Sequence, residues 1–145
     1  MNDTLAVKPP TWFWVVAGLG LAWNLLGVVA FVMQMTLTPE ALAELSEAER
    51  QLVQATPLWV NMVYAVAVFG GALGCAALLT RKSWAVALLV ISLLAVLLQM
   101  SYAFLMSDSL EVYGNAALVM PIIVIVIAIF LVWFAVMAKG KGWIR

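Results

Sequence analysis

The chain has 145 residues, of which 67% are hydrophobic and 10% are charged, whereas a soluble domain has about 45–50% apolar and about 25% charged residues. This composition argues against a soluble fold, because too few polar residues remain to cover its surface, and it fits one domain embedded in a bilayer. Seven basic and seven acidic residues leave no net charge and no basic block, which argues against nucleic acid as a partner.

Four stretches are apolar enough to cross a bilayer core about 30 Å thick, which takes about 20 residues in a helix. In chain order they are residues 12–35, 58–80, 84–106 and 117–138, and none contains Asp, Glu, Lys, Arg or His. A soluble core helix rarely runs so far without a charge. We therefore predict an all-α fold, an integral membrane four-helix bundle that occupies residues 1–145 as a single transmembrane domain.

The loop between the first two spans carries local helix signals. Thr38-Pro39-Glu40 has the pattern of an N-cap, a first-turn proline and an acidic second position. Ser46 and Glu49 have the spacing of a capping box. We therefore expect a short helical outer loop. Side-chain caps are also expected at the starts of the spans, from Thr11, Thr56, Ser83 and Asn115.

The charged residues are distributed unevenly between the two sides of the predicted bundle. Six of the seven basic residues flank the spans on one side, at Lys8, Arg81, Lys82, Lys139, Lys141 and Arg145. The loops at 36–57 and 107–116 carry six of the seven acidic residues. Because basic residues are enriched in cytoplasmic loops, we expect both termini in the cytoplasm and both acidic loops outside.

Uncharged polar residues recur at steps of three and four in the first three spans, which places them on one face of each helix. Six of them share the outer third of the bundle, at Gln34, Asn61, Tyr64, Gln99, Ser101 and Tyr102. Two interpretations stay open. These side chains form a polar pocket that opens outward, or they pair with one another and with backbone carbonyls as hydrogen bonds between helices.

Small residues mark the expected contacts between helices. Close packing drives helix association in lipid, so we expect helix packing at Gly20, Asn24, Gly27, Gly70, Gly71 and Gly74. The fourth span has no polar stripe and is rich in β-branched residues. It is therefore expected to be the most lipid-exposed helix, or to pack against another copy of the protein.

Several kinds of chemistry are missing from the sequence. Histidine is absent, and the lone Cys75 excludes an intrachain disulfide and a thiol relay. Proton-coupled transport usually needs an ionisable group inside the membrane, and none of the spans has one. We therefore expect no catalytic residues, no metal, no cofactor and no enzymatic activity.

Nearly the whole chain resembles a group of short, uncharacterised bacterial inner-membrane proteins that often carry the automatic label "sugar transporter". The likeness rests on residues 23–27 (Trp-Asn-Leu-Leu-Gly), 33–35 (Met-Gln-Met), 56–59 (Thr-Pro-Leu-Trp), 67–71 (Ala-Val-Phe-Gly-Gly), 81–84 (Arg-Lys-Ser-Trp), 99 (Gln), 111–114 (Glu-Val-Tyr-Gly), 120–122 (Met-Pro-Ile) and 142–143 (Gly-Trp). The resemblance implies a four-span protein of the bacterial cytoplasmic membrane and brings no established mechanism.

Two classes of function are expected. The first is a non-enzymatic accessory or interaction subunit, whose partners are the lipid bilayer, further copies of the chain or another membrane protein. The second is an oligomeric channel or carrier for a small neutral solute such as a sugar. A continuous water-sized path between the polar stripes would favour the second class, and a packed core would favour the first.

Overall fold

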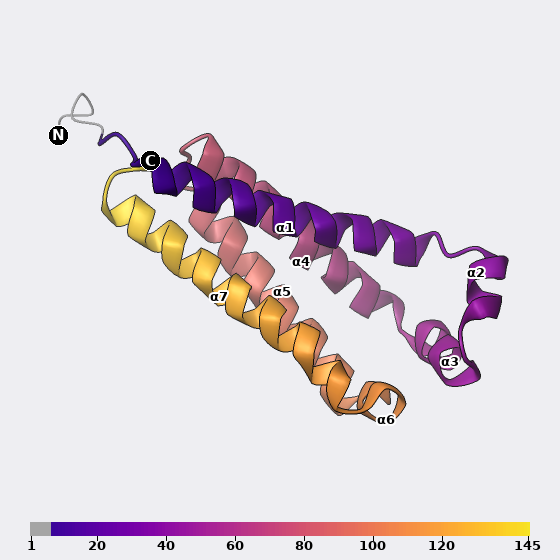
Figure 1. Ribbon diagram of the computed structural model, residues 1–145. Helices are drawn as coiled ribbons and strands as arrows, with labels where there is room; N and C mark the ends of the chain where they lie inside the picture. The colour runs from indigo at the N-terminus through magenta and orange to yellow at the C-terminus, as the bar shows by residue number, and fades with distance from the viewer. Residues whose placement is uncertain (1–6) are drawn as a thin grey trace.

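The computed structural model describes residues 7–145, which form four long helices and several short ones (Figure 1). The long helices are α1 (Thr11–Met35), α4 (Leu58–Leu79), α5 (Ala85–Leu105) and α7 (Val119–Gly140). The connections hold α2 (Pro39–Glu44), α3 (Glu47–Ala55), α6 (Ser109–Tyr113) and the 3-10 helix η2 (Gly114–Leu118). No strand occurs within the described range, and four helices are long and apolar enough to cross a membrane. The predicted all-α membrane bundle is confirmed.

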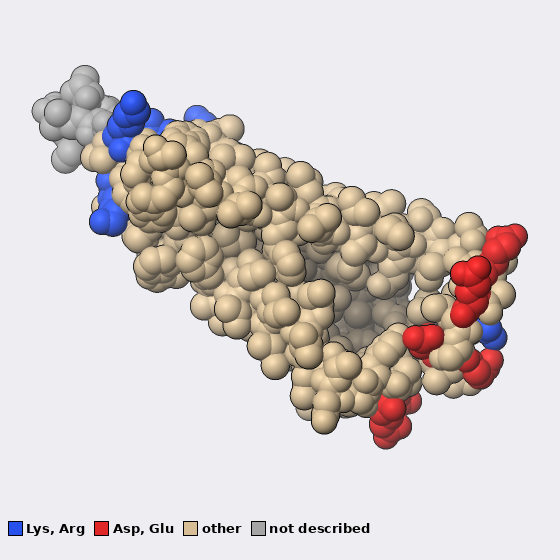
Figure 2. All heavy atoms as spheres, viewed as in Figure 1, with Lys and Arg blue, Asp and Glu red and all other residues tan. Residues whose placement is uncertain are grey.

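The two ends of the bundle differ in charge. The terminal end holds residues 7–10, the turn at 80–84 and residues 141–145, and the loop end holds α2, α3 and α6 (Figure 1). Lysine and arginine gather at the terminal end, whereas aspartate and glutamate gather at the loop end (Figure 2). On the face that Figure 2 shows, no charged side chain lies between the two ends, and the long helices expose many large apolar side chains, as lipid contact requires.

Helix α4 is the central element of the bundle. It packs along α1 and along α5, and α5 packs in turn along α7. Helices α1 and α7 approach each other at the terminal end and diverge toward the loop end (Figure 1). In α4, 44% of the most apolar stretch is buried, against 17% for the fourth span and 11% for α1. The expectation that the fourth span is the most exposed is therefore wrong, because α4 is the only helix that packs extensively against α1 within the described residues. Packing of the fourth span against another copy stays a prediction.

Glycines permit the close approach of α4 to α5 and α1. A Cβ on Gly74 would lie 2.7 Å from Leu89 Cγ, whereas a Cβ on Gly70 would meet Ser92 Cβ at an ordinary 3.5 Å. A Cβ on Gly71 would overlap the carboxamide of Asn24 of α1. The two other glycines expected at contacts also lie against neighbouring helices, with Gly20 beside Leu131 and Gly27 beside Val68.

The larger of the two buried apolar clusters lies at the terminal end. There Phe13 of α1 and Phe134 of α7 are fully buried, and Trp143 packs its ring edge-on against Phe13. Cys75 and Leu78 of α4 complete this core from the other side. The bundle is therefore filled with side chains at the terminal end, where α1 and α7 meet.

Arg81 ties both ends of the described chain to the turn between α4 and α5. Its Nε donates a hydrogen bond to the Trp143 carbonyl at 2.8 Å, and its Nη2 donates one to the Val7 carbonyl at 2.9 Å. The Ser83 N–H donates to the Arg145 carbonyl, and the Arg145 N–H donates to the Arg81 carbonyl. Three of these bonds fix the residues that follow α7 against the turn, and the fourth holds Val7 beside them.

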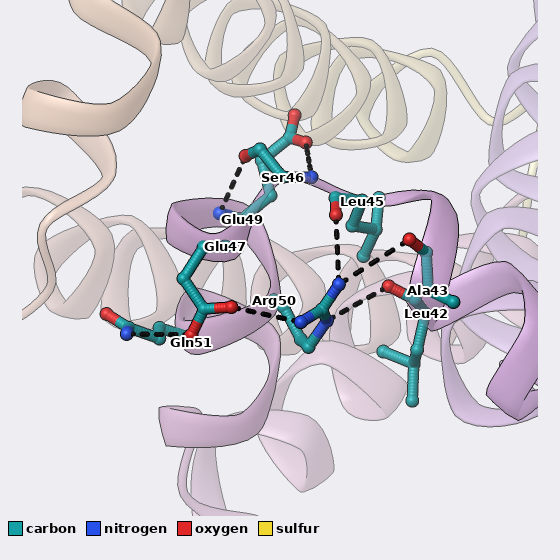
Figure 3. Close-up of polar contacts among 8 residues, drawn as sticks. All are labelled: Leu42, Ala43, Leu45, Ser46, Glu47, Glu49, Arg50 and Gln51. Carbon is teal, nitrogen blue, oxygen red and sulfur yellow. Dashed lines mark hydrogen bonds and ion pairs between the residues drawn. The ribbon is translucent and has the colours of Figure 1, made fainter.

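A single arginine organises the corner between α2 and α3 (Figure 3). Arg50 donates hydrogen bonds to the Leu42 and Leu45 carbonyls at 3.2 Å each, and it pairs with Glu47 at 3.0 Å. Because the last carbonyls of a helix lack internal partners, the guanidinium closes the C-terminus of α2. The corner is thus a defined turn rather than a loose connection.

Local signals predicted the helix starts of this corner but not those of the spans. Thr38 accepts a hydrogen bond from the Ala41 N–H, and Ser46 and Glu49 form the predicted capping box. The expected caps at Thr11, Thr56, Ser83 and Asn115 are wrong. Pro10 and Pro57 occupy the N-cap positions of α1 and α4, where an extended backbone enters the helix.

Candidate binding cavity between the long helices

A cavity of about 400 Å³ lies between α1, α4, α5 and α7. Its walls are mostly apolar, and α7 contributes Met120, Val124 and Leu131 to them. It exists because α1 and α7 separate toward the loop end, where Figure 2 shows a hollow in the surface between the helices. Ligand pockets in proteins usually have volumes of about 300–1,000 Å³, so this cavity is large enough for a small molecule.

A second cavity of about 140 Å³ lies nearer the loop end. Its lining is more polar than that of the large cavity, with Gln34, Asn61 and Tyr102 from the three polar helices. Tyr64 and Gln99 line both cavities, so the two spaces meet at these side chains. The rim at the loop end is completed by Thr56, which follows α3, by Ser107, which precedes α6, and by Ser109, the first residue of α6.

Polar groups in the wall of the large cavity are held by hydrogen bonds. The Asn24 amide donates to the Gly20 carbonyl at 2.8 Å and contacts Cys75 Sγ at 3.6 Å. The Ser92 hydroxyl donates to the Ala67 carbonyl at 2.6 Å and so links α5 to α4. Ser92 therefore fits the interpretation that polar side chains form hydrogen bonds between helices. Asn24 bonds mainly to its own helix.

The polar side chains that the long helices contribute to the small cavity are not paired in this way. Asn61 Oδ1 is buried and has no hydrogen-bond partner. Leaving such a buried acceptor unpaired costs about 1–3 kcal/mol. Among residues 7–145 the structure also shows no hydrogen bond to the side chains of Gln34, Tyr64, Gln99 and Tyr102. These side chains line a space instead of holding one helix to another.

The structure places five of the six predicted outer polar residues at the small cavity and one elsewhere. Ser101 is exposed on another face of α5, and its hydroxyl donates to the Leu97 carbonyl at 2.8 Å. Its assignment to the pocket is wrong, because two residues beyond Gln99 a helix has turned by about 200°. The apolar wall from α7 was not predicted, because α7 has no polar stripe to mark the face that lines the cavity.

The large cavity has a closed floor toward the terminal end. Leu131 lines the cavity and also belongs to the buried core, where it is 4% exposed. Beyond it lie the buried rings of Phe13 and Phe134. Within residues 7–145, these buried side chains close the interior toward the terminal end.

Comparisons with protein-family models, curated proteins and solved structures find no match for this chain. The resemblance to short bacterial inner-membrane proteins stays a prediction. What the protein does has to be inferred from the chemistry of its own cavities.

Both cavities are lined by neutral groups. Their polar members are amides, hydroxyls and phenols, and no Asp, Glu, Lys or Arg contributes to either lining. Within the described part of the chain, no group of three or more His, Cys, Asp or Glu residues is placed to hold a metal ion. Hydrogen bonds and apolar contact are the interactions that this lining offers a ligand.

Proposed function

We propose that this chain is a non-enzymatic protein of the bacterial cytoplasmic membrane that binds a small uncharged molecule and serves as an accessory subunit. The observation that carries the proposal is the large cavity, which holds a few neutral polar groups within an apolar wall. That combination is typical of small-molecule sites. As an accessory subunit, the chain would contact further copies of itself or another membrane protein through the exposed faces of the long helices, and ligand binding would act on the partner through these faces.

The proposal places the loop end outside the cell and the terminal end in the cytoplasm. The gathering of basic side chains at the terminal end supports this orientation (Figure 2). Because the cavities lie toward the loop end, the ligand would reach them from the outer side of the membrane. The closed core at Phe13 and Phe134 would keep it from passing further.

The proposal is tested by identifying small molecules that co-purify with the chain. Membranes would be solubilised in polymer-bounded discs, and the bound molecules would be identified by mass spectrometry. Val124→Trp would fill the large cavity, because Val124 lines it. Val126→Trp is the matched control, because Val126 lies on the same helix and is 59% exposed. We expect a molecule that the Val126→Trp protein retains and the Val124→Trp protein loses. Equal content in both variants would refute binding in the cavity.

A second candidate function is a carrier for a small neutral solute. The observation that favours it is the shape of the interior, which is open toward the loop end and closed by Leu131 at the other. An alternating-access carrier must also open to the opposite side of the membrane, which would require the terminal end to open. Uptake of labelled glucose and glycerol into proteoliposomes tests this candidate, and absence of uptake at every protein density would remove it.

A further inference from the structure

The two cavities together form one elongated space of unequal polarity. The small cavity is rich in amide and hydroxyl groups, the large one is mostly apolar, and Tyr64 and Gln99 stand where they meet. We propose that this space binds a neutral amphiphile, with its polar head in the small cavity and its hydrocarbon chain in the large one. This inference rests on the proposed function and names the class of its ligand.

The small cavity specifies a head group that donates hydrogen bonds. Asn61 Oδ1 is a buried acceptor without a partner, and a hydroxyl or amide of the ligand would supply one. Gln99 and Tyr102 line the same space and each can both donate and accept. A head with several hydroxyl groups, such as glycerol, matches this lining at a volume of about 140 Å³.

The lining also specifies a head without charge. No Asp, Glu, Lys or Arg lines either cavity, so an anionic or cationic head would be buried without a counter-ion. Burying an unpaired charge is far more costly than burying a neutral polar group. The acidic residues of the loop end, such as Glu49 and Asp108, add repulsion toward an anionic head that approaches from outside (Figure 2).

The large cavity is open to the side, between α1 and α7. Leu26 of α1 and Met120 of α7 both line the cavity, yet they remain 66% and 58% exposed. These two side chains therefore flank an apolar opening of the cavity. Because α1 and α7 are membrane-spanning helices, the opening faces the bilayer. Hydrocarbon would enter this opening from the outer leaflet without crossing water, and it would cover apolar wall that a sugar leaves in contact with water.

Photolabelling with a monoacylglycerol that carries a diazirine in its acyl chain tests the proposal. The purified chain would be placed in phosphatidylcholine vesicles, irradiated and digested, and the labelled residues would be found by mass spectrometry. We expect label on the cavity faces of α1 and α7. Unlabelled monodecanoylglycerol would compete, whereas decanesulfonate, decyltrimethylammonium and free glycerol would not. Label spread evenly over the exposed faces of all four helices would overturn the proposal.

Matched variants separate binding in the cavity from general contact with lipid. Val124→Trp and Asn61→Leu would lose the competed label, and their controls Val126→Trp and Asn115→Leu would keep it. Ala30→Trp, at the α1 wall of the large cavity, repeats the test with Ala22→Trp as control. Gel filtration checks that each variant folds.

The outcomes distinguish this inference from the proposed function. If free glycerol or glucose protects the cavity as well as monodecanoylglycerol does, the amphiphile is refuted and binding of an uncharged molecule stands. If a charged amphiphile competes equally, the neutral head is refuted. If every cavity variant labels like its control and also retains the co-purifying molecule of its control, both proposals fall.

Discussion

The ring of Phe13 stacks on the ring of Phe134, with the two centroids 5.6 Å apart and both side chains fully buried. This contact joins the first and the last long helix of the chain. Because α1 and α7 separate beyond it, the same contact closes the bundle at the terminal end and leaves the interior hollow toward the loop end (Figure 1).

Removing the ring of Phe134 should loosen the terminal end. We expect Phe134→Ala to lower the free energy of unfolding by about 2 kcal/mol, below the range of about 3–5 kcal/mol in aqueous cores, because lipid replaces part of the lost apolar contact. Unfolding in mixed detergent micelles by SDS titration would measure it. Phe69→Ala, at a side chain that is 43% exposed, is the control and should cost less. Equal costs would contradict the role of this contact.

Gly70 and Gly74, which lie one turn apart on α4, should respond differently to alanine. At Gly74 a methyl group would press on Leu89, so we expect Gly74→Ala to lower the free energy of unfolding by about 1–3 kcal/mol. At Gly70 the methyl group meets only ordinary contacts, so Gly70→Ala should be neutral or gain up to about 1 kcal/mol of helix propensity. Thermal unfolding of the two variants in one detergent compares them directly, and the reverse order would refute the described approach of α4 to α5.

Asn61 and Ser92 allow the two interpretations of the polar stripes to be separated by stability. Asn61→Leu removes an unpaired acceptor, so we expect unchanged or higher stability of the ligand-free protein. Ser92→Ala removes the bond from α5 to the Ala67 carbonyl and should cost about 0.6 kcal/mol, the average for such bonds in membranes. SDS titration of ligand-free protein measures both. A marked loss of stability in Asn61→Leu would show that its amide holds helices together.

The proposed orientation predicts which introduced thiols a membrane-impermeant maleimide reaches. In a Cys75→Ala background, Glu44→Cys in α2 should be labelled in intact cells. Lys141→Cys should be labelled only after permeabilisation, because basic residues remain on the cytoplasmic side. Both positions are exposed, so access to solvent does not bias the comparison. Labelling of Lys141→Cys in intact cells would invert the orientation.

The four spans and the helical corner could be predicted because their causes are local. Length and apolarity alone indicate a helix that can cross a membrane. The caps at Thr38 and Ser46 bond to N–H groups within three residues along the chain, so their spacing is visible in the sequence. The caps expected at Thr11 and Thr56 are each one residue away from the observed N-cap positions, which Pro10 and Pro57 occupy.

The cavity could be predicted only in part, because it depends on how helices are placed. Periodicity put Asn61, Tyr64 and Gln99 on inward faces, where the structure has them. It could not show that α7 separates from α1 or that apolar side chains of α7 would form one wall. These features follow from contacts between distant segments, which no local pattern records.

The separation of charge along the bundle has a consequence for how copies assemble. The terminal end carries Lys8, Arg81, Lys82, Lys139, Lys141 and Arg145, and acidic residues gather at the opposite end. Moving one charge across a potential of about 100 mV is worth about 2.3 kcal/mol, so copies inserted upside down would be strongly disfavoured. Every subunit in an assembly would then share one direction, and its symmetry axis would run along the membrane normal. An antiparallel dimer would be ruled out.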